Sequence, residues 1–189
     1  MRALISVNIK DEITEFARKL EEMHFEIVTA GATYEILKKE GIQVLNVSEI
    51  IACDNSLDAI IKTLYSEVFA AVDADRYDDL HMSQLKKMQI VPFDMVVINI
   101  HQFDEDIHET THLTLKNIDV GGVTLLKSAC KNFEEIVIVC EPEDYDRVIQ
   151  EMECNGKVSI DTKKQLMKKA FNKLCDYDNM IRNYINEVI

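Results

Sequence analysis

Short, continuously apolar runs alternate with segments of helical periodicity along this chain, and that alternation constrains the fold more than any other feature. The apolar runs are RALISV (2–7), FEIVT (25–29), QVLNV (43–47), DMVVINI (94–100) and EIVIVC (135–140). Their lengths and their richness in β-branched residues are typical of strands. Strands that are apolar on both faces indicate a parallel sheet covered by helices on each side. The sequence therefore predicts an α/β protein, a three-layer αβα fold with a mainly parallel central sheet.

Helical patterns fill most of the intervals between these runs. Gly41 stands at a C-cap position after a predicted helix that begins near Gly31, and Pro142 occupies the favoured first position of another helix. Residues 48–75 give no clear pattern. The remaining predicted helices lie within residues 11–23, 76–89, 117–132 and 159–187, the last of these as one or two long helices.

The chain is strongly acidic. Its 21 basic and 34 acidic residues give a formal net charge of −13, so neither nucleic acid nor an anionic membrane is expected as a partner. An anionic ligand would need a local basic pocket. The 189 residues suit a single domain, and no apolar run approaches the ~20 residues of a membrane span. The five cysteines, an odd number without a CxxC pair, are expected to be free thiols of a cytoplasmic protein.

Polar residues and glycines follow several of the predicted strands. Because the carboxyl ends of parallel strands share one edge of the sheet, these residues are expected to meet in a crevice there. Hydroxyls, a lysine and glycines beside helix N-termini are the parts from which phosphate sites are built. We therefore predict an anion-binding site formed by Ser6, Asn8, Lys10, Thr29, Gly31, Thr33, Asn99, His101, Asp119, Gly121 and Gly122.

Six segments, read in order over nearly the whole chain, resemble a known family. They are ALISVNIK, TAGAT, IKTL, VVINIHQF, NIDVGGVTLLKSACKN and VCEPEDYDRV. They are similar to the inosine monophosphate (IMP) cyclohydrolase domain, which is normally the N-terminal half of a bifunctional purine-synthesis protein with a formyltransferase as its other half. The resemblance implies a methylglyoxal-synthase-like fold, with residues 1–189 as a single domain and the formyltransferase domain absent.

The resemblance also implies an activity. The reaction closes a formamidoimidazole-carboxamide ribonucleotide to IMP with loss of water, and it needs no cofactor. The protein must hold the carboxamide nitrogen against the formyl carbon and stabilise the charge that develops on the formyl oxygen. A homodimer is expected, and a separate formyltransferase chain is a possible partner.

Roles for individual residues follow from the resemblance. Lys62, Asp119 and Lys131 occupy positions that the family uses for catalysis, and His101 is expected to assist them. Thr63 lies beside Lys62. The nucleotide and phosphate loops of the family correspond to Ser6, Asn8, Lys10, Gly31 and Thr33, with Asn99 at a strand end and with Gly121 and Gly122 allowing close approach of the substrate.

Spacing alone supports simpler interpretations of the same residues. Lys127 and Lys131, four residues apart, would ordinarily form a solvated helix face. Asp119 could cap a helix. The ordered match along the chain favours the catalytic interpretation for Asp119 and Lys131 and leaves Lys127 as a surface or interface residue.

The sequence also departs from the family pattern. The family has serine where this chain has Asn8, glycine at Ala32, arginine at Ile60, histidine at Tyr65 and tyrosine at His101. A lost bidentate arginine contact to a charged partner costs about 1.5–3 kcal/mol. The alternative hypothesis is therefore a degenerate paralogue that binds a purine ribonucleotide without catalysis.

HETTH, residues 108–112, matches the zinc-peptidase pattern H-E-x-x-H. That chemistry needs both histidines on one face of a helix and a third ligand further along the chain. Two β-branched threonines followed by LTL make a poor helix here. The resemblance implies a loop over this stretch, before the Asp-Gly-Gly segment, so no metal site is expected.

Overall fold

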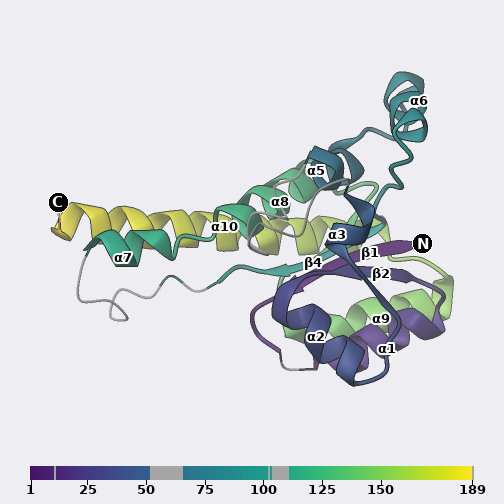
Figure 1. Ribbon diagram of the computed structural model, residues 1–189, viewed down its shortest axis with the longest axis horizontal. Helices are drawn as coiled ribbons and strands as arrows, with labels where there is room; N and C mark the ends of the chain where they lie inside the picture. Colours follow the sequence, from purple (N-terminus) through teal and green to yellow (C-terminus); the bar gives the residue numbers. More distant parts are fainter. Residues whose placement is uncertain (11, 52–65, 102, 104–110, 189) are drawn as a thin grey trace.

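Five parallel strands form the centre of the molecule. The computed structural model describes residues 1–10, 12–51, 66–101, 103 and 111–188 (Figure 1). The strand order is β3-β2-β1-β4-β5, with every neighbouring pair parallel. The strands are β1 (Arg2–Val7), β2 (Glu26–Thr29), β3 (Val44–Asn46), β4 (Met95–Asn99) and β5 (Val137–Val139). All five predicted strands are thus confirmed, each within the predicted run.

The two faces of the sheet bury alternate residues of the same strands. In β1, Ile5 packs into one apolar cluster with helices α1 (Ile13–Glu22) and α9 (Tyr145–Asn155). Leu4 packs into a second cluster with α5 (Ser66–Asp73), α8 (Val120–Lys131) and α10 (Ile160–Val188). Val97 and Ile98 of β4 divide in the same way. Both faces of each strand are therefore covered, which explains why the strands are continuously apolar and confirms the three-layer αβα prediction.

The helices connect the strands and cover both faces of the sheet. They are α1 (Ile13–Glu22), α2 (Gly31–Lys39), α3 (Val47–Ile50), α5 (Ser66–Asp73), α6 (Asp79–Lys87), α7 (Thr111–Lys116), α8 (Val120–Lys131), α9 (Tyr145–Asn155) and α10 (Ile160–Val188), with a 3₁₀ turn at Pro142–Asp144. The sequence left open whether residues 159–187 form one helix or two, and they form one, α10. The predicted helix within 117–132 begins at Val120, because Asp119 caps it.

The loop predicted around residues 111–116 is wrong: these residues form α7. Leu115 and the following Ile118 pack against a cluster of Phe103, Tyr177 and Tyr184, two of which belong to the far half of α10. Helix propensity is a weak preference that tertiary burial overrides. In Figure 1, α7 lies beside the C-terminal half of α10, which extends well beyond the sheet.

An ion-pair network ties α10 to the carboxyl end of β5. Lys169 and Lys173 of α10 both pair with Glu141, and Lys169 also contacts Asp144 at 2.6 Å. Burial alone would raise the pKa of Glu141, but the hydrogen bonds from the two lysines outweigh it and lower that pKa. The network therefore stabilises the charged carboxylate and fixes α10 against the functional edge of the sheet.

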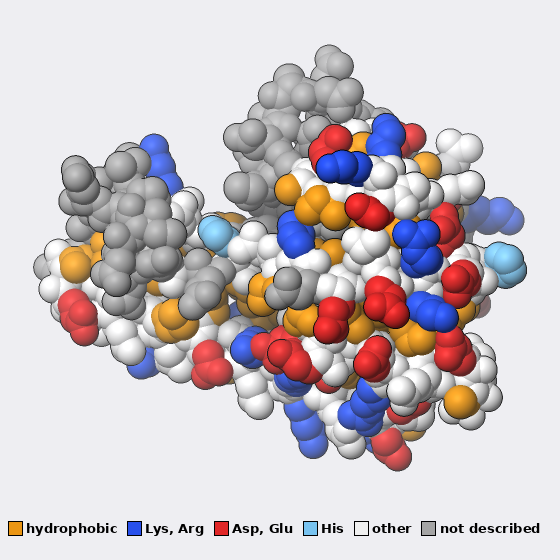
Figure 2. Space-filling view, turned by 90° about the horizontal axis from the view of Figure 1, so that it is seen from below, with side chains coloured by type: hydrophobic (Ala, Val, Ile, Leu, Met, Phe, Trp, Pro, Cys, Tyr) orange, Lys and Arg blue, Asp and Glu red, His pale blue; other side chains and the backbone are white. Residues whose placement is uncertain are grey.

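Charge and thiols follow the expectations from composition. On the face seen in Figure 2, acidic and basic side chains are interspersed. Cys130, Cys140, Cys154 and Cys175 are free thiols, as predicted, while Cys53 lies outside the described residues. Within the described part of the chain, no helix is both long and apolar enough to cross a membrane.

Candidate active site at the carboxyl edge of the sheet

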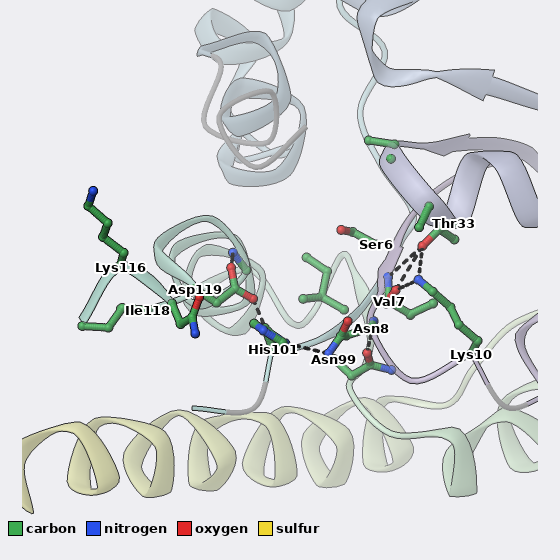
Figure 3. Close-up of a pocket in the computed structure, with 16 residues that line it drawn as sticks. Ser6, Val7, Asn8, Lys10, Thr33, Asn99, His101, Lys116, Ile118 and Asp119 are labelled. Carbon is green, nitrogen blue, oxygen red and sulfur yellow. Dashed lines mark hydrogen bonds between the residues drawn. The ribbon is translucent and has the colours of Figure 1, made fainter. Parts of the chain in front are cut away.

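A cavity of about 410 Å³ lies where the carboxyl ends of β1 and β4 meet the N-termini of α2 and α8. Its size falls within the range of small-molecule sites, ~300–1,000 Å³. It brings together most of the residues predicted to meet at this edge (Figure 3). The lining residues are Ser6, Val7, Asn8, Lys10, residues 30–33, Ile98, Asn99, His101, residues 116–119 and Gly122.

One end of the cavity is basic. The Lys10 ammonium donates hydrogen bonds to Thr33 Oγ1, at 2.8 Å, and to the Val7 carbonyl. Both partners are neutral, and no carboxylate among the described residues pairs with Lys10. Partial burial lowers the pKa of Lys10. A half-buried ammonium without a carboxylate, in a chain of net charge −13, is suited to an anionic ligand.

The N-terminus of α2 opens onto the same end. Gly31, the first residue of this helix, has φ = 56°, a left-handed conformation that glycine adopts without strain. The N-cap residue, Ala30, provides no side-chain hydrogen bond, so side-chain capping does not satisfy the first N–H groups of the helix. Such N–H groups, together with the helix dipole, bind phosphate and carboxylate groups. Ala32 sits within this turn and lines the cavity.

The other end of the cavity carries a carboxylate. Asp119 Oδ1 accepts a hydrogen bond from the Gly122 N–H at 2.8 Å, and Oδ2 accepts one from the His101 N–H at 3.0 Å. The helix-cap interpretation of Asp119 is thus confirmed. Each carboxylate oxygen keeps further lone pairs, so the cap also leaves Asp119 able to accept from a ligand.

The Asp119 carboxylate requires a glycine at position 122. A Cβ atom at Gly122 would lie 2.4 Å from Asp119 Oδ2, well inside van der Waals contact. Gly121 is buried within α8 and is absent from the cavity lining. The expectation that glycine here lets the substrate approach stays a prediction for Gly122, which lines the cavity. Gly121 lies in the helix interior, away from the lining.

Hydrogen bonds join the loop after β1 to the end of β4 in the middle of the cavity. Asn99 Oδ1 accepts from the backbone N–H groups of Asn8 and of Ile9, the latter at 2.9 Å. The Asn8 side-chain amide contacts His101 Nδ1 at 2.7 Å. Figure 3 shows Asn8, Asn99 and His101 between Lys10 on one side and Asp119 on the other. The two ends of the cavity are therefore held in a fixed relation.

Lys131 does not join this cavity within one chain. It is the last residue of α8, whereas Asp119 precedes the first, so the two are about 18 Å apart along the helix axis. The Lys131 ammonium pairs with Asp73 of α5 at 2.8 Å, and its side chain is 69% exposed. The predicted grouping of Lys131 with Asp119 is thus wrong for a single subunit, because a twelve-residue helix separates them. Lys127 is exposed, as expected.

Two predicted site residues, Lys62 and Thr63, lie outside the described residues, as do Ile60 and Tyr65. The HETTH motif falls mostly outside them as well. Among the residues that are described, no group of three or more histidine, cysteine, aspartate or glutamate side chains could hold a metal ion.

Sequence reasoning missed Tyr177 of α10. Its hydroxyl oxygen accepts a hydrogen bond from the backbone N–H of Asp119 at 2.8 Å, so it anchors the residue that caps α8. Tyr177 is 58 residues away in sequence, and no local pattern marks it. Lys116 was also missed; it lines the cavity, although Figure 3 shows its side chain extending away from Asp119.

The fold and the cavity define an α/β domain with a ligand site at the carboxyl edge of its parallel sheet. Residues 12–124 match the family model of the MGS-like domain, and residues 129–188 match that of the AICARFT/IMPCHase bienzyme. The chain belongs to the MGS-like domain family.

Individual relatives agree with this assignment. The chain is 40% identical over 190 residues to the bifunctional purine biosynthesis protein PurH of Caldicellulosiruptor bescii, covering 99% of this chain and 37% of that protein. It is 39% identical over 191 residues to PurH of Acetivibrio thermocellus, again covering 37% of the relative. The chain thus spans little more than a third of these relatives. The crystal structure of ForH superposes with a TM-score of 0.88 over 98% of both chains, at 24% identity, which establishes likeness of fold.

Proposed function

We propose that this chain is an IMP cyclohydrolase of purine biosynthesis, which closes a formamidoimidazole-carboxamide ribonucleotide to IMP and releases water. The polarity of the cavity carries this proposal. One end holds the Lys10 ammonium, which has no carboxylate partner among the described residues, and a helix N-terminus without a side-chain cap. A carboxylate and an imidazole lie at the other end. A ribonucleotide has the matching polarity, with a phosphate at one end and a base precursor at the other.

The basic end would hold the phosphate. Lys10, the hydroxyl of Ser6 and the N–H groups at the start of α2 offer a charge and several donors to one group. Thr33 positions Lys10, since it accepts one of the ammonium hydrogens. This anchoring places the ring precursor toward His101 and Asp119.

Ring closure is intramolecular, so positioning supplies much of the acceleration. The carboxamide nitrogen attacks the formyl carbon, and the formyl oxygen gains negative charge. That oxygen takes up the two protons given up by the carboxamide and formamide nitrogens and leaves as water. Asp119 would accept a hydrogen bond from the carboxamide nitrogen and take up its proton. His101 would face the formyl oxygen. Lys62 and Thr63 keep the roles implied by the resemblance, and both lie outside the described residues.

The similarities support this assignment: residues 129–188 match the family model of the AICARFT/IMPCHase bienzyme, and the relatives are bifunctional purine biosynthesis proteins. The proposed substrate carries a formyl group, so a formyltransferase must supply it. We further propose a cytoplasmic location. We also propose a homodimer, which light scattering on the purified chain would test.

Turnover tests the proposal. The purified chain is expected to convert the formylated ribonucleotide to IMP, followed by ultraviolet absorbance, at a rate above the uncatalysed one. Asp119→Asn should lower kcat by about 10²-fold or more, as loss of a general base does. Asp146→Asn, at an exposed position of α9, removes an equal charge and should leave the rate unchanged. A wild-type rate equal to the uncatalysed rate would exclude the enzyme.

Two observations favour a second candidate, a purine-ribonucleotide-binding protein without catalysis. Both carboxylate oxygens of Asp119 accept hydrogen bonds from backbone N–H groups, and Lys131 lies at the far end of α8. This candidate predicts IMP binding in calorimetry without turnover. If neither binding nor turnover is measured, both candidates fail.

A further inference from the structure

Asn8 and His101 stand at two of the positions where this chain departs from the IMP cyclohydrolase pattern, and they contact each other. The Asn8 side-chain nitrogen lies 2.7 Å from His101 Nδ1. With the amide nitrogen facing the ring, as in this contact, the amide is the donor, and Nδ1 is the acceptor and carries no proton. The ring hydrogen of a neutral imidazole is then on Nε2.

The surroundings hold both partners of this contact in place. The backbone N–H groups of Asn8 and Ile9 donate to Asn99 Oδ1, which fixes the loop after β1 to the end of β4. The His101 N–H donates to Asp119 Oδ2 at 3.0 Å, which fixes the histidine backbone to α8. Asn99 is only 7% exposed, so this junction is a rigid part of the cavity floor. The orientation of the imidazole is therefore fixed at two points, the His101 backbone N–H and Nδ1.

No described residue forms a hydrogen bond with His101 Nε2, and His101 lines the cavity. An N–H group in that position is a hydrogen-bond donor that awaits an acceptor from a ligand. A carbonyl-type oxygen that gains negative charge is the acceptor such a donor stabilises best.

We propose that Asn8 is a positioning residue that holds His101 as the neutral Nε2–H tautomer, so that His101 donates a hydrogen bond to the carbonyl-type oxygen of a ligand instead of acting as a base at Nε2. The choice of this oxygen as the formyl oxygen rests on the proposed function; the tautomer does not. Asn8 and His101 thus act as one unit.

The tautomer can be read directly by ¹⁵N NMR of the histidine rings at mildly alkaline pH, where the imidazole is neutral. Loss of one set of ring signals in His101→Phe assigns this residue among the five histidines. The wild-type protein is expected to show His101 as the Nε2–H form. Asn8→Asp places a carboxylate, which only accepts, against Nδ1 and should convert the ring to the Nδ1–H form.

Asn155→Asp, at an exposed position at the end of α9, is the matched control and should leave the His101 signals unchanged. A wild-type ring in the Nδ1–H form, or a ring that stays Nε2–H in Asn8→Asp, would overturn the proposal. If Asn8→Asp does not fold, Asn8→Ser provides the second test: it removes the amide donor, and a mixture of the two tautomers should replace the single one.

Kinetics then separate this inference from the proposed function. If the chain is a cyclohydrolase, Asn8→Asp should lower kcat by about 10²-fold, the effect of losing one donor to a developing oxyanion, with a much smaller change in KM. A normal kcat in a variant whose tautomer has changed would overturn the donor role. If the wild-type chain shows no turnover, the proposed function fails, while the NMR result still decides whether Asn8 sets the tautomer.

Discussion

Replacement of Lys10 by methionine should weaken nucleotide binding without weakening the fold. Among the described residues, the Lys10 ammonium donates hydrogen bonds to the Thr33 hydroxyl and the Val7 carbonyl alone. Its burial lowers its pKa, which means that the folded protein disfavours the charge. Methionine keeps the length and the apolar stem of the side chain. The lost hydrogen bonds, each worth about 1 kcal/mol, are offset by relief from burying a charge, so the free energy of unfolding should change by less than about 1 kcal/mol.

The loss on the ligand side should be larger. A hydrogen bond to a charged group is worth about 1.5–3 kcal/mol, which corresponds to a rise of about 10- to 150-fold in the Kd for IMP. Calorimetry measures the Kd, and urea unfolding measures stability on the same samples. Lys127→Met, at an exposed position on α8, is the matched control and should change neither quantity.

The opposite pattern would refute the reasoning. Suppose that Lys10→Met lowers the free energy of unfolding by about 2 kcal/mol or more, as loss of a core contact does, while the Kd for IMP is unchanged. Lys10 is then a structural residue of the loop after β1. The basic end of the cavity would then have no demonstrated role in ligand binding.

Three further perturbations test other contacts. Gly122→Ala should displace the Asp119 carboxylate, because the added Cβ would lie 2.4 Å from Asp119 Oδ2. The free energy of unfolding should fall by about 1–2 kcal/mol, as it does on loss of an N-cap, and turnover should be abolished. Normal turnover would contradict this displacement of the carboxylate. Tyr177→Phe keeps the ring but removes the acceptor of the Asp119 N–H, so kcat should fall with little change in the Kd for IMP, whereas an unchanged kcat would show that α10 does not position the site. Because the pKa of Glu141 is lowered, its carboxylate stabilises the fold at pH values above glutamate's ordinary pKa of 4.5. This contribution is lost as the pH falls through the folded-state pKa. The stability advantage of the wild type over Glu141→Gln should therefore disappear in acid unfolding titrations.

The sheet was predictable because burial on both faces leaves a clear signature. Each observed strand lies within a continuously apolar run, and the residues of one run divide between the two apolar clusters. The carboxyl-edge site followed from the parallel order, which brings Lys10, Thr33, Asn99 and Asp119 to one edge. α7 could not be foreseen, since its helical state depends on packing against α10 rather than on its own propensity.

Contacts of long sequence separation account for the rest. The hydrogen bond between Tyr177 and Asp119 joins segments 58 residues apart, and the Asn8–His101 contact joins segments 93 apart. The distance from Asp119 to Lys131, in contrast, could have been worked out from the sequence once a helix was expected between them, because twelve residues at 1.5 Å each place them at opposite ends.

A crystal structure of the chain with bound IMP tests most directly whether the cavity is a polarised nucleotide site. The phosphate is expected within hydrogen-bonding distance of Lys10 Nζ and the first N–H groups of α2, with the purine ring against His101 and Asp119. A phosphate at the Asp119 end, or IMP bound instead in the groove between α5, α6 and α8 that Lys127 and Lys131 line, would contradict this assignment.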